Sequence, residues 1–115
     1  MKTIIYHNPR WGKSRDSVRI LSEKKIPFTI IEYLKNPLKV DELKQIVNLL
    51  NLNALDIIRT NEKDYKENNL GALHDNEQKL FEAIEQFPKI MQRPIIIHGK
   101  KAVIGRPPEN INKII

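Results

Sequence analysis

The segment from Tyr6 to Arg15 carries the side chains with the clearest capacity for chemistry. It reads YHNPRWGKSR, with the basic Lys13 and the hydroxyl of Ser14 shortly after an Asn8-Pro9 turn. A β-rich run precedes the segment and an amphipathic run follows it, so we expect it to join a strand to a helix. Unpaired backbone N–H groups and the positive dipole end at a helix start both favour an anion. The segment therefore predicts an anion-binding loop, the alternative being a solvated basic surface.

The elements that would position this loop are expected in the order βαβ, helices, then ββα. The first half is predicted as a strand over 2–6, a helix with Val18, Ile20 and Leu21 on one face, and a parallel strand over 28–34. The middle is predicted as helices from Asp41, over 53–58, over 62–67, and after a capping box of Asp75 and Gln78. The last part is predicted as a hairpin over 94–104 that turns at His98-Gly99, and a short helix from Pro107-Pro108. This order is typical of an α/β, thioredoxin/glutaredoxin-like fold with a mixed four-stranded sheet, and it is also compatible with other small α+β sandwiches.

Composition limits the function classes that remain. A chain of 115 residues suits one domain over 1–115, and no apolar stretch is long enough to cross a bilayer, so we expect a cytoplasmic protein with no membrane partner. The net charge of +6 suits a small anion, a nucleic acid or a basic surface. The chain has no cysteine, which excludes a disulfide, a thiolate metal site and a thiol nucleophile. His74 and His98 have no partners at metal-ligand spacing, so no metal site is expected.

The loop resembles the signature of the arsenate reductase family, in which His, three residues, Cys, three residues and Arg follow one another. His7, Trp11 and Arg15 stand at these positions, so Trp11 occupies the place of the catalytic cysteine. The similarity continues through Tyr33-Leu34-Lys35-Asn36-Pro37, Arg59-Thr60-Asn61, Gln92-Arg93-Pro94-Ile95 and Ile104-Gly105-Arg106-Pro107-Pro108-Glu109. By these residues the chain is similar to a short bacterial branch of the glutaredoxin-dependent arsenate reductases.

The resemblance implies a function, a site and a structural feature. The family activity is reduction of arsenate to arsenite, with a low-pKa cysteine attacking arsenic and with glutathione and glutaredoxin as electron donors. The family's three oxyanion-binding arginines correspond to Arg59, Arg93 and Arg106, and the planar fork of a guanidinium group suits an oxyanion. His7 would tune the cysteine or stabilise the loop, the Arg93–Pro94 bond would be cis, and the chain would be a monomer. The expected oxyanion-binding residues are Asn8, Gly12, Lys13, Ser14, Arg15, Arg59, Arg93 and Arg106.

Tryptophan at the cysteine position changes the expected chemistry. An indole N–H donates a hydrogen bond but is no nucleophile. Ser14 has no base beside it in the sequence, and oxygen does not support thiol exchange with glutathione. We therefore expect a pseudoenzyme that holds arsenate, phosphate or sulfate, binds no cofactor, and has little or no reductase activity. The bulk of Trp11 predicts partial occlusion of the pocket, the alternative being an outward side chain that leaves the arginines open.

Two other function classes are open. The first is a regulatory interaction protein that resembles the RNA-polymerase-binding branch of the same fold, because Trp and Arg are enriched at interface hot spots. Those regulators carry a Cys-x-x-Cys pair where this chain has Trp11 and Ser14. The second is direct nucleic-acid binding, which the net charge of +6 suggests and no motif supports.

Overall fold

The computed structural model describes residues 2–115, which form two compact units. The first unit combines the two ends of the chain, up to Asn36 and from Arg93 onward. The second unit spans Pro37–Gln92. The expectation of a single domain stays a prediction.

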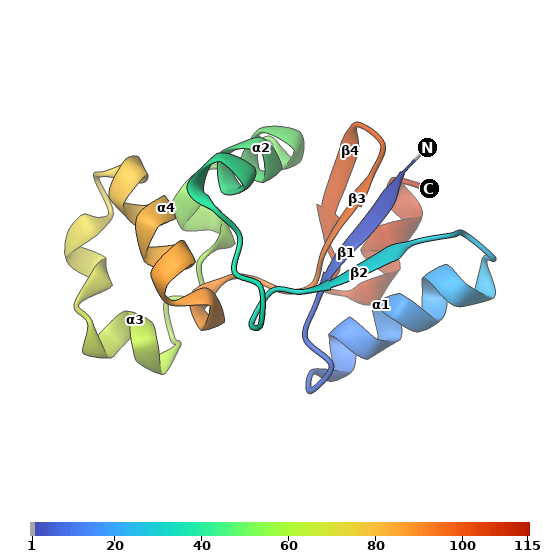
Figure 1. The fold of residues 1–115 in the computed structure, drawn as a ribbon, viewed down its shortest axis with the longest axis horizontal. Helices are drawn as coiled ribbons and strands as arrows, with labels where there is room; N and C mark the ends of the chain where they lie inside the picture. The colour runs from blue at the N-terminus through green and yellow to red at the C-terminus, as the bar shows by residue number, and fades with distance from the viewer. Residues whose placement is uncertain (1) are drawn as a thin grey trace. The chain divides into compact units, whose positions relative to one another are not determined.

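A four-stranded sheet is the framework of the first unit (Figure 1). Its strands are β1 (Thr3–His7), β2 (Thr29–Glu32), β3 (Ile95–His98) and β4 (Lys101–Ile104). They lie in the order β2-β1-β3-β4, with β1 parallel to β2 and antiparallel to β3, and β3 antiparallel to β4. The predicted mixed sheet is therefore confirmed. This order places β1 and β3 in the centre of the sheet. Because β1 and β3 are antiparallel, the loop after β1 and the segment before β3 lie at the same end of the sheet.

Two helices cover one face of this sheet. They are α1 (Gly12–Glu23) and η4 (Pro108–Lys113), which contact each other. The shared core includes Ile5 and Ile96, which are register partners on β1 and β3, together with Leu21 and Ile111. All four side chains are fully buried, and burying a side chain of this size contributes about 1.5–3 kcal/mol. Leu21 lies near the end of α1, so these apolar contacts hold the second half of the helix against the sheet.

The second unit is helical. It contains α2 (Val40–Leu50), η1 (Ala54–Ile57), α3 (Lys63–Glu67), η2 (Leu70–Leu73), α4 (Glu77–Gln86) and η3 (Pro88–Ile90). The predicted helices from Asp41, over 53–58 and over 62–67 are confirmed within a residue or two. Leu43 and Ile46 of α2 and Leu80 and Ile84 of α4 are buried, and the two helices are in contact. The 3.6-residue spacing of these side chains is the reason the sequence predicted both helices.

Three sequence predictions about boundaries are wrong. The predicted strand over 28–34 is only Thr29–Glu32, because the chain turns where Lys35 N–H and Asn36 N–H donate to the Glu32 carbonyl. The predicted hairpin turn at His98-Gly99 is one residue later, because His98 still pairs with Lys101 in the ladder. Gly99 takes the left-handed conformation there, with φ of 62°.

The third correction concerns the start of α4. The expected capping box of Asp75 and Gln78 does not form, and Asn76 is the N-cap. Its side-chain oxygen accepts a hydrogen bond from Lys79 N–H at 3.1 Å. The Gln78 side chain instead donates to Glu82 on the exposed face. Asp and Asn are similar N-cap residues, so two such neighbours leave the first residue of the helix undecided by sequence.

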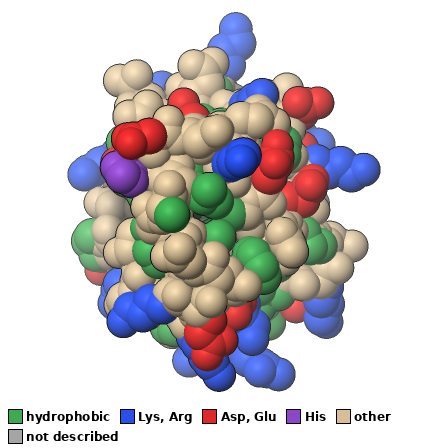
Figure 2. All heavy atoms as spheres, turned by 90° about the vertical axis from the view of Figure 1, so that its left-hand side faces the viewer, with side chains coloured by type: hydrophobic (Ala, Val, Ile, Leu, Met, Phe, Trp, Pro, Cys, Tyr) green, Lys and Arg blue, Asp and Glu red, His purple; other side chains and the backbone are tan. Residues whose placement is uncertain are grey.

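The surface of the molecule bears on the possible partners. Figure 2 shows the face on the α3 side, where Lys and Arg side chains and Asp and Glu side chains appear together around exposed hydrophobic ones. This face therefore does not concentrate the positive charge that a nucleic-acid backbone would need. No helix within residues 2–115 is both long and apolar enough to cross a membrane.

Candidate functional site

The loop between β1 and α1 is held by its own polar groups. Asn8 organises it, because its carbonyl accepts from Trp11 N–H at 3.1 Å and its side-chain oxygen accepts from Arg10 N–H at 3.1 Å. Asn8 N–H donates in turn to Ser14 Oγ at 3.0 Å. Trp11 is the N-cap of α1 without a capping side chain, and Arg15 N–H donates to its carbonyl. The loop conformation is therefore fixed by hydrogen bonds inside it.

A buried histidine–serine pair lies beneath the loop. His7 Nδ1 and Ser14 Oγ are 2.6 Å apart, and Ser14 is 0% exposed. Burial lowers the pKa of His7, with Arg15 acting in the same direction and Glu32 opposing both. Burial therefore favours the neutral form of the His7 imidazole. In the sequence no base is adjacent to Ser14. The fold nevertheless places the His7 imidazole, a possible base, next to the Ser14 hydroxyl.

A small cavity opens beside the loop. Its volume is about 200 Å³, and its lining residues are Trp11, Gly12, Lys13, Arg93 and Arg106. They come from the start of α1, from the residue before Pro94, and from the segment after β4, which meet at one end of the sheet. Three of these side chains are cationic, and none of the described residues that line the cavity is acidic. Such a cavity favours an anion.

Trp11 and Arg93 form the best-defined contact of the cavity. The Arg93 guanidinium carbon lies 3.5 Å from the centroid of the Trp11 ring, a cation–π contact. Arg93 is 4% exposed, whereas Trp11 is 43% exposed. Trp11 therefore forms one wall of the cavity and also reaches solvent.

Backbone geometry brings the arginines to the cavity. The Arg93–Pro94 peptide bond, which the family resemblance implied to be cis, is cis in the structure, and so is Arg106–Pro107, for which there was no such expectation. Gly105 N–H donates to the Pro94 carbonyl at 2.8 Å. A Cβ at Gly105 would lie 2.8 Å from Pro94 Cγ and 2.8 Å from Ser17 Oγ. Only glycine allows this close approach of the segments that carry Arg93 and Arg106.

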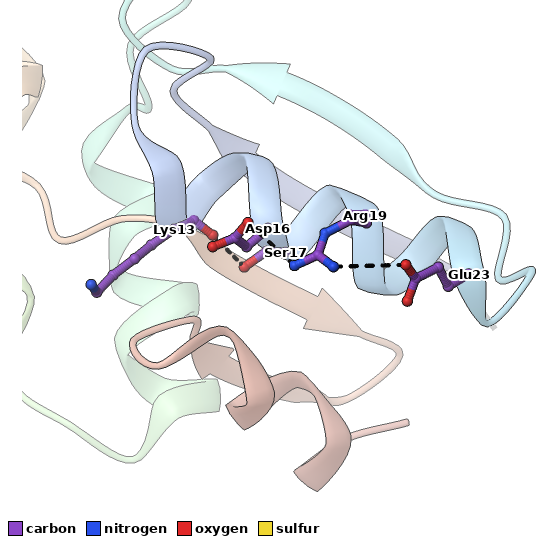
Figure 3. A network of polar contacts seen from close by, with 5 residues as sticks. All are labelled: Lys13, Asp16, Ser17, Arg19 and Glu23. Carbon is purple, nitrogen blue, oxygen red and sulfur yellow. Dashed lines mark hydrogen bonds and ion pairs between the residues drawn. The ribbon is translucent and has the colours of Figure 1, made fainter.

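Lys13 lines the cavity, whereas Arg19, Asp16 and Glu23 of the same helix form ion pairs with one another. Figure 3 shows Lys13 pointing away from Arg19, which contacts Asp16 at 3.3 Å and Glu23 at 3.8 Å. Ser17 Oγ donates to the Lys13 carbonyl at 2.9 Å, so only the main chain of Lys13 is engaged by this group. The two ion pairs are largely exposed and contribute little stability.

The structure does not bring every expected oxyanion-binding residue to this cavity. Asn8 and Ser14 are buried within the loop, and the Arg15 guanidinium donates to the Pro9 carbonyl at 3.1 Å. Arg59 belongs to the second unit, where its guanidinium lies 3.1 Å from Glu62 and its backbone N–H donates to Ile90. The expectation that Arg59 binds the same anion stays a prediction.

Two features of the site were missed by reasoning from the sequence. One is the His7–Ser14 hydrogen bond, for which the seven-residue spacing across a turn gave no signal. The other is the stacking of Trp11 on Arg93, which joins distant parts of the chain. In residues 2–115 no cluster of three or more His, Asp or Glu side chains is arranged to hold a metal ion.

Comparison with known proteins identifies relatives of the whole chain. The sequence model of the ArsC family matches residues 6–114. An arsenate reductase of Haemophilus influenzae is 40% identical over 116 aligned residues, covering 100% of both chains. The uncharacterized protein YfgD of Escherichia coli K12 is 38% identical over 112 residues, covering 96% of this chain and 94% of that one. The solved structure of an arsenate reductase from Vibrio cholerae has a TM-score of 0.95 at 38% identity, covering 100% of this chain and 98% of that one.

Proposed function

Because the chain belongs to the ArsC family, we propose that it binds a small oxyanion in the cavity beside the loop but lacks the family's thiol chemistry. The observation that carries this proposal is the charge of the cavity. Lys13, Arg93 and Arg106 line it, and no acidic side chain among the described residues does. Arsenate, phosphate and sulfate are the candidate ligands.

The geometry supports anion binding in physical terms. Arg93 lines the cavity while its guanidinium lies over the Trp11 ring, so its positive charge lies beside an anion bound there. Each hydrogen bond from a charged donor to the anion contributes about 1.5–3 kcal/mol. The cavity of about 200 Å³ is small enough to suit a ligand with few atoms.

The missing thiol is the reason to propose impaired catalysis. Trp11 stands where the family signature has its nucleophilic cysteine, and the chain has no cysteine at any other position. Ser14 is paired with His7, but it is 0% exposed and its oxygen also accepts from Asn8 N–H, so it does not face a ligand. Loss of a catalytic nucleophile in a hydrolase lowers turnover by about a million-fold. A comparable loss of arsenate reduction is proposed here.

Calorimetric titration with arsenate, phosphate and sulfate tests the binding site. We expect binding to the wild-type chain and a loss of about 10–100-fold in Lys13→Gln and Arg106→Gln, which corresponds to about 1.5–3 kcal/mol. Arg19→Gln is the matched control, because Arg19 is a cation of α1 that contacts Asp16 and Glu23 instead of the cavity. Absence of heat at millimolar concentrations of all three anions would contradict the proposal.

Replacing Trp11 by cysteine tests the second half of the proposal. Arsenate reduction is measured with glutathione and glutaredoxin for the wild-type chain and for Trp11→Cys. We expect no turnover above background in the wild type and measurable turnover in the variant, because only the nucleophile is restored. Turnover by the wild-type chain at the level of the variant would refute the proposed impairment.

One observation favours a second candidate function. The 43% exposure of Trp11 leaves an aromatic side chain at the surface, as a protein interface would require. The candidate is a regulatory interaction protein that binds RNA polymerase. Gel filtration with purified RNA polymerase tests it, with Trp11→Ala as the variant that should lose co-elution. Separate elution of the wild-type chain would remove this candidate.

A further inference from the structure

The position of Trp11 bears on what kind of anion the cavity accepts. One face of the indole is covered by the Arg93 guanidinium at 3.5 Å, yet the residue is 43% exposed. Tryptophan is one of the most highly buried residue types on average. This one instead places part of an aromatic surface at the edge of a cationic cavity. A ligand that carried only negative charge would make no use of that surface.

The size of the cavity limits how a ligand can lie in it. Pockets for drug-sized ligands begin at about 300 Å³, whereas this cavity measures about 200 Å³. It can therefore seat a charged headgroup but not a large organic group as well. Any organic part of the ligand must leave the cavity along one of its walls.

The residues that line the cavity differ in chemistry. This difference determines along which wall the organic part of the ligand would leave the cavity. Lys13 and Arg106 present charged groups, which favour the headgroup, and Gly12 has no side chain. Trp11 is the aromatic wall, and aromatic rings attract one another beyond the burial of apolar area when they stack offset or edge-to-face. A planar group joined to the headgroup would lie against the indole while its negative charge meets the cations.

We propose that the cavity selects a phosphate monoester of a planar aromatic group, with Trp11 as the specificity-determining residue that binds the ring. This inference rests on the proposed oxyanion site and adds its ligand class. The Arg93 guanidinium contacts one face of the indole, and the aromatic ring of the ligand contacts the exposed part of the indole. Tryptophan at this position then has a binding role.

Phenyl phosphate, methyl phosphate and inorganic phosphate separate the contributions of ring, ester and charge. Trp11 is the only tryptophan of the chain, so its fluorescence reports binding at this site without interference. At equal ionic strength we expect phenyl phosphate to bind about tenfold tighter than methyl phosphate, which is about 1.4 kcal/mol. Quenching or a spectral shift of the indole should accompany phenyl phosphate in particular.

Two variants at the same position test whether the ring contact is responsible. Trp11→Phe keeps an aromatic face and should keep a preference for phenyl phosphate, whereas Trp11→Leu keeps only apolar surface and should lose it. Both are measured by calorimetry, with circular dichroism to verify folding. Equal binding of phenyl and methyl phosphate by the wild type, or an unchanged preference in Trp11→Leu, would overturn this inference and leave the oxyanion site standing. Failure of all three phosphates to bind would overturn both.

Discussion

Gly105→Ala is the substitution for which the structure gives the most definite consequence. An added Cβ would lie 2.8 Å from Pro94 Cγ, 2.8 Å from Ser17 Oγ and 3.0 Å from Ile96 Cδ1. These three atoms belong to three different residues, one of them on α1 and another on β3. Two of the distances are too short for carbon–carbon or carbon–oxygen contact, so neighbouring side chains must shift and the added methyl group acts as an overpacked core substitution.

The expected cost follows from the class of perturbation. Overpacking a well-packed core destabilises a protein by about 1–3 kcal/mol. We expect the free energy of unfolding of Gly105→Ala to fall by that amount in urea denaturation followed by circular dichroism, and the thermal midpoint to fall by roughly 5–15 °C. Anion binding should weaken as well, because Gly105 N–H is bonded to the Pro94 carbonyl and Arg106 follows it directly.

Two further variants make this prediction specific. Gly12→Ala is the matched control, since the nearest atom to its added Cβ is Arg15 Nη2 at 3.9 Å and alanine favours a helix over glycine by about 0.5–1 kcal/mol. Ser17→Ala removes one of the three close atoms and costs about 0.5–1.5 kcal/mol for its lost hydrogen bond to the Lys13 carbonyl. Ser17→Ala combined with Gly105→Ala should cost less than the sum of the two single changes. Wild-type stability of Gly105→Ala, or strict additivity of the pair, would refute the steric reasoning.

Three other substitutions test parts of the site and the fold. Ser14→Ala should lower the free energy of unfolding by about 1–3 kcal/mol in urea denaturation, because it leaves the buried Asn8 N–H without its acceptor; a neutral effect would contradict this. His7→Asn should lessen the loss of stability at acid pH. Because the pKa of His7 is lowered in the fold, its contribution is complete above about pH 6.5 and falls as pH drops below that value; equal pH profiles of variant and wild type would exclude this role. Asn76→Ala should lower the free energy of unfolding by about 1 kcal/mol in thermal unfolding, because Asn76 is the N-cap of α4, whereas Asp75→Ala should change it hardly at all. A larger loss in Asp75→Ala than in Asn76→Ala would instead support the capping box of Asp75 and Gln78.

The secondary structure of this protein was largely predictable from its sequence because the information is local. The apolar spacing around Leu43, Ile46, Leu80 and Ile84 is helical, and each of these residues is buried in the structure. The absence of a thiol is likewise a property of the sequence alone. Boundaries were less well predicted, since neighbouring residues such as Asp75 and Asn76 can both begin a helix.

The composition of the site was decided by tertiary structure. The sequence identified Trp11, Lys13, Arg93 and Arg106 as candidates, but only the pairing of β1 with β3 brings Arg93 to the loop after β1. The same packing buries Ser14 against His7 and so removes its hydroxyl from the cavity.

The physical reason for this division is the range of the interactions involved. Periodicity, capping and the lack of cysteine are read from residues close together in the chain, and the sequence by itself determined them. The stacking of Trp11 on Arg93 and the tight passage of Gly105 past Pro94 depend on long-range contacts within a packed core. Such a core admits only one arrangement of these side chains, and that arrangement appears only when the whole sheet is assembled.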